Sequence, residues 1–392
     1  MLAFSRKRLI ASLVGLLLLL STASAIYYFL RPAQTPQESA QKETPKFEAF
    51  WKQRIEAAMA PSNCPDTGQP KIPTTSYQGK LYDGHIHIPS IFTGGENDEP
   101  SYEDKVVNST LGVNIKMSEF VCVLEHDGTS KAFAFFPVYR EMSRQHIEIA
   151  KQTMERYPDR FVPYVMPPDN DGSKDGFPTV DADSLKKMLG ADPGLFKGYG
   201  EIGLYARSGG SPALFPDSPR LTEIYPVVRK NKLLIYFHLG EGMRESYKKI
   251  IKANPDINFL FHGDQLIQCE KCSQDLSQIE DVLGSAPNVY YEVDELWGDV
   301  FIFQPEVTKK QFFNHFKDYK PLLKKDVATW KGFIEKFPDQ VIWGSDRGIF
   351  RWPVDLEVSR QLTDYVRAFI ARLDPTVQEK YAYKNIEKLL PN

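Results

Sequence analysis

Short apolar segments alternate with longer amphipathic segments along most of the chain. The apolar segments have the composition of buried strands, and they are Lys80–Ile86, Phe120–Leu124, Phe161–Val165, Gly198–Ile202, Leu233–Phe237, Asn258–Phe261, Val289–Glu292 and Val341–Trp343. The amphipathic segments have helical spacing, as in Ser143–Tyr157, Thr222–Lys230, Met243–Asn254 and Leu276–Ala286. Strands that alternate with helices predict an α/β fold with a parallel sheet. Eight such units are typical of a (β/α)8 TIM barrel; a doubly wound open sheet is the alternative, but it does not require eight.

The N-terminal segment has a different pattern. Arg6, Lys7 and Arg8 precede an uncharged, mostly apolar run from Leu9 to Leu30. About 20 apolar residues in a helix span a bilayer, and basic residues before the run predict a cytoplasmic N-terminus with the remainder exported. A cleaved signal peptide, with an A-x-A site at residues 23–25, is the alternative. The apolar run continues beyond that site, which favours an uncleaved anchor.

These patterns divide the chain into three parts. Residues 1–31 are predicted to be a membrane anchor or signal segment, residues 32–46 a solvated linker, and residues 47–392 one folded domain. Both interpretations of the N-terminus place that domain outside the cytoplasm, either periplasmic or extracellular. Such a compartment permits disulfides among the four cysteines. The Cys269-x-x-Cys272 pair supplies only two of the roughly four ligands that a structural zinc site needs.

Net charge and composition narrow the class of partner. The chain is 42% apolar and 25% charged, with a formal net charge of -3. These are ordinary values for a globular protein. Because proteins that bind nucleic acid usually have a basic patch or stripe, the charge gives no reason to expect a nucleic acid partner.

Polar residues recur where the predicted strands end. His85 and His87 are two residues apart at the end of the first strand, so their side chains point to the same face. Four further residues stand at or just after the ends of strands four, five, six and eight: Glu201, His238, His262 and Asp346. The carboxyl ends of barrel strands meet at one mouth, where active sites lie. The sequence therefore predicts one polar site from these six residues.

This order resembles the amidohydrolase superfamily, whose pattern is H-x-H on strand one, His on strands five and six, and Asp on strand eight. Tyr157–Phe161, with the sequence Y-P-D-R-F, and the closing segment Tyr383–Leu390 are similar to its amidohydrolase-related branch. The resemblance covers residues 80–390 and implies a TIM barrel. It also implies that His262 binds a second metal or polarises the substrate. The metal ligands that it implies are His85, His87, His238 and Asp346.

Two interpretations of Glu201 stay open. Binuclear members of the superfamily have a bridging carboxylated lysine or a glutamate on strand four, and Glu201 matches that glutamate. The phrase G-E-I-G-L at residues 200–204 also resembles TatD-type nucleases, in which this glutamate binds metal. Alternatively, Glu201 accepts a hydrogen bond that orients a liganding histidine.

The implied chemistry is metal-dependent hydrolysis. Imidazoles and carboxylates suit one or two ions of Zn²⁺, and also Mn²⁺ or Fe²⁺. A bound ion lowers the pKa of its water toward about 7, and Asp346 is the expected general base. The metal and His262 would stabilise the oxyanion. Arg347 would either hold a substrate carboxylate through a bidentate pair or be a solvated rim charge or part of a local salt bridge. We therefore predict cleavage of an ester, lactone or amide bond in a small molecule.

Two other functions remain as alternatives. A non-oxidative decarboxylase on the same scaffold would be favoured by one metal ion and an arginine aimed at a carboxylate. A non-catalytic ligand-binding barrel is the other, although the intact ligand set argues against it. The segment Trp297–Trp330 is either a lid or a packed insertion. Substrate contacts or local salt bridges are expected from a last set of polar residues, namely Glu125, His126, Asp127, Glu292 and Asp294.

Overall fold

The computed structural model describes residues 45–65, 69–88, 115–138, 143–168, 170–206, 212–262, 276–294, 296, 308–347 and 355–390. The chain divides into two compact units, Met1–Thr44 and Pro45–Asn392, and all described residues belong to the second. Among them, no helix has both the length and the apolar character needed to span a bilayer. The predicted anchor at residues 1–31 lies outside the described residues, as do Cys269 and Cys272.

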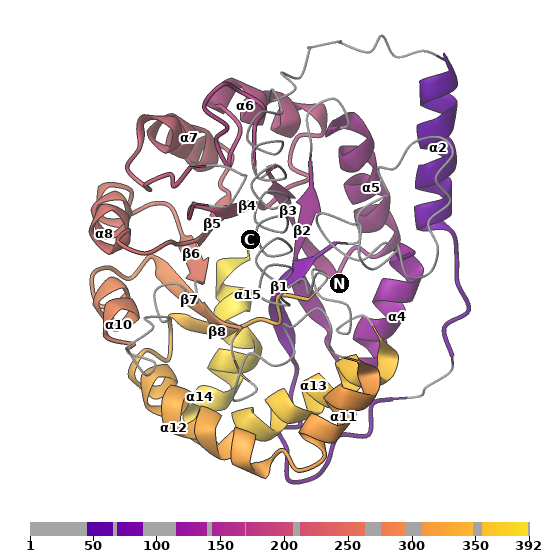
Figure 1. Cartoon of the computed structure of the whole chain (residues 1–392), viewed down its shortest axis with the longest axis vertical. Helices are drawn as coiled ribbons and strands as arrows, with labels where there is room; N and C mark the ends of the chain where they lie inside the picture. The colour runs from indigo at the N-terminus through magenta and orange to yellow at the C-terminus, as the bar shows by residue number, and fades with distance from the viewer. Residues whose placement is uncertain are drawn as a thin grey trace, which may run out of the picture. The chain divides into compact units, whose positions relative to one another are not determined.

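Eight parallel strands form one sheet in sequence order (Figure 1). They are β1 (Tyr82–His87), β2 (Lys131–Pro137), β3 (Phe161–Met166), β4 (Gly198–Gly203), β5 (Leu234–His238), β6 (Phe259–His262), β7 (Val289–Val293) and β8 (Val341–Trp343). A parallel bridge between Ile86 and Arg347 joins the end of β8 to β1, and the backbone N–H of His87 donates to the Arg347 carbonyl at 2.8 Å. These contacts close the sheet, so the predicted (β/α)8 TIM barrel is confirmed.

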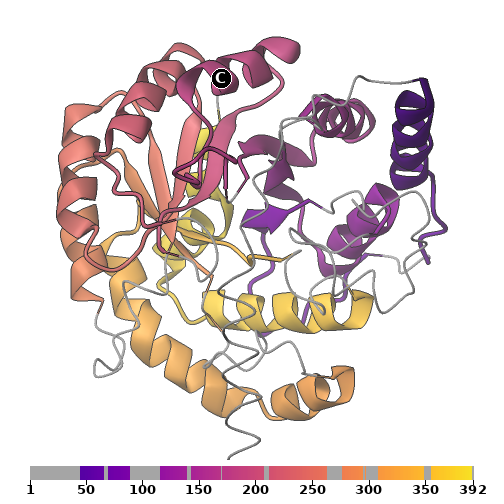
Figure 2. The ribbon, with the colours of Figure 1, turned by 45° about the horizontal axis from the view of Figure 1, so that its top comes forward.

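The helices surround the strands (Figure 2). Those before β5 are α2 (Pro45–Met59), α4 (Met117–Asp127), α5 (Ser143–Arg156), α6 (Ala182–Ala191) and α7 (Pro219–Lys230). Those after it are α8 (Arg244–Ala253), α10 (Ser277–Leu283), α11 (Lys309–Phe316), α12 (Lys320–Lys336), α13 (Leu356–Ile370), α14 (Pro375–Glu379), the π-helix η3 (Lys380–Lys384) and α15 (Asn385–Leu389). Several begin at a capping side chain; Asp181, for example, accepts from the Ser184 N–H at 2.7 Å.

The prediction of a strand at Phe120–Leu124 is wrong, because this segment lies within α4. Buried residues recur along α4 at helical spacing, and Gly128, with φ of 81°, ends the helix in the left-handed conformation. The second strand is instead the next apolar run, Lys131–Pro137, which is buried at every position after the first. A short apolar run does not by itself distinguish a buried strand from a buried helix.

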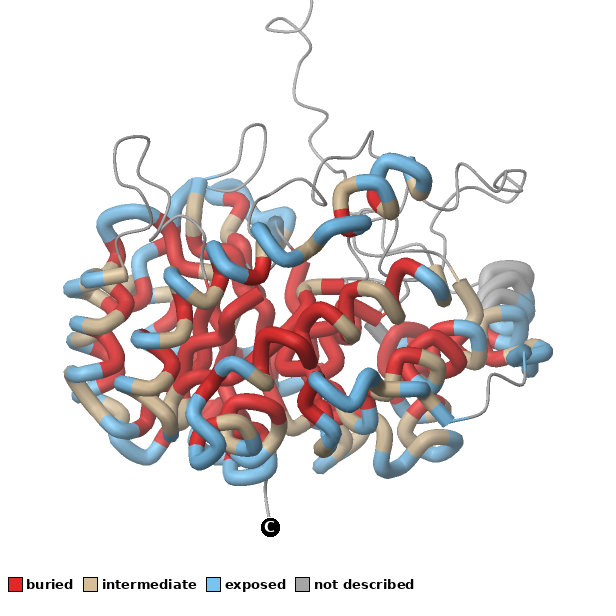
Figure 3. Tube along the Cα trace, turned by 90° about the horizontal axis from the view of Figure 1, so that it is seen from below, coloured by how far each residue is buried: buried red, intermediate tan, exposed pale blue. Residues whose placement is uncertain are grey.

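The interior of the barrel is a packed core rather than a channel. Phe133, Phe135, Tyr164 and Tyr236 fill it, and buried residues follow the strands while exposed residues follow the outer helices (Figure 3). Apolar residues of α15 join the same interior cluster, and α15 therefore closes the barrel at the end where the strands begin. The carboxyl ends of the strands, where β1 carries His85 and His87, lie at the other end.

One disulfide joins the segment after α2 to the barrel. Cys64 is bonded to Cys122 of α4 across 58 positions of sequence. The helix α2 lies beside α4 and α5 (Figure 1), and the Ser118 hydroxyl donates to the Ala60 carbonyl at 2.8 Å. The described chain before β1 is thus anchored to the first helices of the ring.

Candidate metal centre

The six residues predicted from the strand ends lie together at one end of the barrel. The β-strands deliver His85, His87, Glu201, His238 and His262, and Asp346 follows β8. Asp346 has a positive φ of 46°, a conformation that non-glycine residues rarely adopt and that is concentrated at functional sites. Two groups of three side chains have ligand atoms within 4.8 Å of one another, and Glu201 belongs to both.

The first group surrounds the H-x-H motif. The Nε2 atoms of His85 and His87 are 3.1 Å apart. Oδ1 of Asp346 lies 3.4 Å from Nε2 of His85 and 3.0 Å from Nε2 of His87. Oε2 of Glu201 is 3.6 and 3.5 Å from the same two nitrogens. Two imidazole nitrogens and two carboxylate oxygens therefore converge on one point.

The second group uses the other oxygen of Glu201. Oε1 lies 2.9 Å from Nδ1 of His238 and 2.8 Å from Nε2 of His262. The imidazole rings of these two histidines are 4.2 Å apart between centroids. Glu201 thus divides its two oxygens between two pairs of histidines, which is the geometry of a carboxylate that bridges two ions.

The electrostatics of the centre favour a cation. Burial alone would raise the pKa of Glu201, but His262 and hydrogen bonds from His238 and His262 outweigh it and hold the pKa well below its usual range. Burial would lower the pKa of His262, yet Asp294 and Glu201 raise it to about 10. Glu292 and Asp346 act in the same direction on His85. Carboxylates thus draw positive charge into a buried site, and the donor set fits a divalent ion.

Gly200 explains how β4 presents Glu201. Its φ is 133°, and a Cβ atom there would lie 2.4 Å from the carbonyl oxygen of Tyr236 on β5. The register between β4 and β5 shifts between Tyr199 and Ile202. Only glycine allows this close approach. The approach directs the next side chain, that of Glu201, toward the metal centre.

Arg347, predicted to hold a substrate carboxylate, is 2% exposed and occupied by groups of the chain itself. Its Nη1 donates to Asp127 of α4 at 2.6 Å and to the Ser359 hydroxyl of α13 at 2.9 Å. Its Nε lies 3.2 Å from Asp83 and donates to Ser345 at 2.9 Å. This geometry favours a structural role for Arg347 over the predicted contact with substrate.

The weaker candidates on α4 lie away from the centre. Glu125 is exposed and pairs with Arg160 at 3.1 Å, and Asp127 is buried against Arg347. His126 accepts from Arg360 through its backbone carbonyl at 3.3 Å. Because the strand expected before these residues is a helix, they do not follow the carboxyl end of a strand.

The described part of Trp297–Trp330 supports the packed insertion. Phe312 and Phe316 of α11 are buried, as are Leu323 and Trp330 of α12. Residues 297–307 lie outside the described residues, so the prediction of a lid is not tested there.

Two carboxylates near the centre have roles that the sequence left open. Glu292 lies 3.2 Å from Nδ1 of His85, and Asp294 lies 2.8 Å from Nδ1 of His262. Both pairs are buried. The signal in the sequence is two acidic residues at alternate positions along an otherwise apolar strand.

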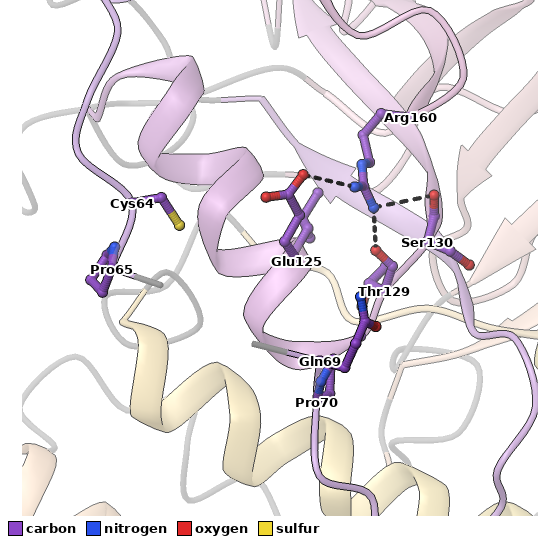
Figure 4. Close-up of a pocket in the computed structure, with 10 residues that line it drawn as sticks. Cys64, Pro65, Gln69, Pro70, Glu125, Thr129, Ser130 and Arg160 are labelled. Carbon is purple, nitrogen blue, oxygen red and sulfur yellow. Dashed lines mark hydrogen bonds and ion pairs between the residues drawn. The ribbon is translucent and has the colours of Figure 1, made fainter. Parts of the chain in front are cut away.

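A separate pocket of about 740 Å³ lies beside the disulfide (Figure 4). Arg160 donates there to the carbonyls of Thr129 and Ser130 at 2.8 and 3.3 Å. These two residues precede β2, whereas the metal-binding groups stand at the carboxyl ends of strands. The pocket is therefore at the other end of the barrel and is not part of the centre.

Comparison with known proteins identifies solved structures that are similar to this chain. No family model matches the chain, and no curated protein matches it. An amidohydrolase from Burkholderia multivorans with bound HEPES has a TM-score of 0.50 and 11% identity, covering 80% of this chain and all of its own. A probable 2-pyrone-4,6-dicarboxylic acid hydrolase from Acinetobacter baumannii has a TM-score of 0.46 and 12% identity, and the match covers 79% of this chain and 99% of that one. A 5-carboxyvanillate decarboxylase from Novosphingobium aromaticivorans has a TM-score of 0.44 and 14% identity, and the match covers 82% of this chain and 98% of that one. The first of these matches shows that this chain and that protein share a fold.

Proposed function

We propose that this chain is a metal-dependent hydrolase of the amidohydrolase-related branch, acting on an ester, lactone or amide bond of a small molecule. The observation that carries the proposal is the division of Glu201 between two histidine pairs. This geometry suits two divalent ions better than one, and the donor set suits Zn²⁺, with Mn²⁺ and Fe²⁺ as alternatives. In this proposal Glu201 is a bridging ligand rather than only an orienting acceptor.

The residues then have distinct tasks. Divalent ions held by these histidines and carboxylates would supply hydroxide near neutral pH and would polarise the bond to be cleaved. Asp346 has the most exposed side chain of the carboxylates there, at 15% against 7% for Glu201, so it is placed to accept a proton from water and pass it to the leaving group. His262 has both ring nitrogens engaged, by Glu201 and Asp294. This favours His262 as a ligand over a group that polarises the substrate.

A non-oxidative decarboxylase on the same scaffold is the alternative function. Its two expected features were a single ion and an arginine aimed at a substrate carboxylate. The geometry supports neither, because two histidine pairs share Glu201 and Arg347 is buried between Asp83 and Asp127. Hydrolysis is therefore the better-supported reaction.

Elemental analysis of the purified full chain in detergent tests this proposal. We expect about two equivalents of a transition metal, falling to one or none in Glu201→Gln, together with hydrolysis of ester, lactone or amide substrates that requires the metal. One equivalent, combined with release of CO2 from aromatic carboxylates, would favour the decarboxylase. A wild-type chain that takes up no zinc or manganese would overturn both enzymes in favour of the ligand-binding barrel.

The proposal includes an exported, membrane-anchored location. The basic and apolar pattern of residues 1–31 supports it, and so does the disulfide between Cys64 and Cys122, because such bonds persist mainly outside the cytoplasm. The substrate would then be encountered in the periplasm or outside the cell.

A further inference from the structure

Glu292 of β7 and Asp294, which directly follows that strand, lie beside the metal centre but belong to neither group of ligands. Side chains of a strand alternate between its faces, and Tyr290 lies in the interior cluster while Tyr291 and Val293 pack toward the helices. Glu292 and Asp294 therefore share the inner face with Tyr290. The same strand thus reaches both halves of the centre, two residues apart.

Glu292 is committed to His85. Its side chain has 0% exposure, and its Oε2 atom lies 3.2 Å from Nδ1 of His85. Neither of its oxygens has a hydrogen-bond partner in the part of the chain that the structure describes, so its contact with His85 is an ion-pair distance rather than an aligned hydrogen bond. Gly344 makes room for it, since a Cβ atom at that position would lie 1.6 Å from Oε1. A buried carboxylate with one polar neighbour is costly, so its presence points to a task at that neighbour.

Asp294 stands in the same relation to His262. Its Oδ2 atom lies 2.8 Å from Nδ1 of His262, and the Nε2 atom of the same ring faces Glu201 at 2.8 Å. Asp294 is 6% exposed, so the pair is shielded from water. In both pairs the carboxylate lies beside Nδ1, hydrogen-bonded to it in the case of Asp294, and Nε2 is directed at the centre.

We propose that Glu292 and Asp294 are positioning residues, each of which sets the metal affinity of a different half of the centre. This inference rests on the proposed two-ion function. A carboxylate that accepts from Nδ1–H fixes the proton there, orients the ring and increases the basicity of Nε2. Glu292 acts in this way on the group of His85 and His87, and Asp294 on the group of His238 and His262. The affinities of the two ions are therefore tuned separately from one strand.

Tyr236 offers a competing partner in the first half. Its hydroxyl lies 3.3 Å from Nδ1 of His85, only slightly farther than the Glu292 carboxylate. A hydroxyl is neutral, and a hydrogen bond to an ionised partner is roughly twice as strong; burial raises the pKa of Glu292 to about 8. We expect the larger effect from Glu292 because its carboxylate lies closer to Nδ1, at 3.2 Å, and Tyr236→Phe is the matched variant that separates the two.

Titration of the full chain with Mn²⁺ tests the inference without relying on turnover. Equilibrium dialysis gives the affinity of each site, and electron paramagnetic resonance distinguishes a spin-coupled Mn²⁺ pair from a single ion. For Glu292→Gln we expect one site weakened by about 10- to 100-fold and the other unchanged, with the same pattern for Asp294→Asn. Tyr236→Phe should change the first site by less than about threefold. Saturating Mn²⁺ should restore the coupled signal in both amide variants, which a misfolded chain would not do.

Reference variants identify which half is affected. His87→Ala leaves the second half, and His238→Ala leaves the first. Glu292→Gln should weaken the remaining site only in the His238→Ala background, and Asp294→Asn only in the His87→Ala background. Asp326→Asn changes a carboxylate that is equally buried, at 3% exposure on α12, and should leave both affinities unaltered.

Three results would overturn the inference: unchanged affinities in both amide variants, an equal loss at both sites from either one, or a larger effect from Tyr236→Phe than from Glu292→Gln. Each presupposes a wild-type chain that binds two ions. A wild-type chain that binds none would instead overturn the proposed function, so the two failures are distinguishable.

Discussion

At the scale of single residues, Arg347 shows that a position beside a ligand can serve the fold rather than the substrate. It follows Asp346 directly, yet its guanidinium lies between Asp83 of β1 and Asp127 of α4. Asp83 in turn accepts from the backbone N–H groups of His85 at 3.1 Å and Ser345 at 2.9 Å. The arginine thus ties the segment after β8, which carries Asp346, to β1 and to α4.

Replacement of Arg347 by methionine should destabilise the chain by about 3–5 kcal/mol, because it leaves two buried carboxylates without their cation. Urea unfolding measures the change. Arg229→Met, which removes an exposed ion pair with Asp256 at 2.5 Å, is the matched control and should change the free energy of unfolding much less, because solvent screens an exposed pair. If the Arg347→Met chain were as stable as the wild type and only its KM rose, the result would favour the predicted contact of Arg347 with substrate.

Gly200→Ala should remove metal binding as well as stability. The new Cβ atom would meet the backbone of Tyr236 at 2.4 Å in a conformation with φ of 133°, and we expect a cost of about 3 kcal/mol. The displaced backbone carries Glu201, so metal content should fall to one equivalent or none. Gly190→Ala in α6 has open space around it and should retain both stability and metal. Retention of two ions by Gly200→Ala would refute this account of β4.

At this scale the sequence predicted those site residues whose positions follow from the alternation of side chains along a strand. His85 and His87 are such a pair, and the ends of later strands added the rest of the cluster. The role of Arg347 was not predictable in this way, because Asp127 lies 220 positions away in the sequence. The pairing of Glu292 with His85 likewise depends on which strands face each other across the barrel.

At the scale of elements, the error in the second strand shows the limit of hydrophobic patterning. Phe120–Leu124 and Phe133–Phe136 are both short apolar runs, and both are buried. What separates them is context: the first continues a helical spacing that ends at Gly128, whereas the second is buried on both faces between β1 and β3. The seven other strands were placed correctly because loops and helices flank them clearly.

The packing of α5 predicts a dependence of stability on pH. His146 of α5 is 2% exposed, and burial lowers its pKa to about 4. The unfolded chain binds a proton at that histidine near pH 6.5, whereas the folded chain does not until about pH 4, so stability is full above pH 6.5 and is lost as the pH falls. Between pH 7 and pH 5 this residue should cost about 2 kcal/mol.

Comparison of the wild type with His146→Gln isolates this effect from protonation of the metal centre, which both chains share. Urea unfolding at pH 7 and pH 5 should show a fall that is about 2 kcal/mol smaller in the variant. Equal falls in the two chains would mean that His146 is protonated in the folded state.

At the scale of the whole molecule, the disulfide connects the fold to the compartment. It closes a loop of 58 positions that contains β1, so reduction should lower the free energy of unfolding by about 2–4 kcal/mol.

Oxidised Cys64 and Cys122 require export, and export depends on the apolar run in residues 1–31. A chain that begins at Pro32 after an initiating Met should therefore stay in the cytoplasm of its host with both thiols reduced. With Cys269 and Cys272 replaced by serine in both chains, alkylation with a maleimide polymer, after the host is lysed in acid, should shift the gel mobility of the truncated chain by two more labels than the full chain. Intact mass of the full chain then decides between an anchor and a signal peptide, because only an anchor retains residues 1–31. Equal labelling of the two chains would separate the disulfide from export and leave the N-terminal segment without this support.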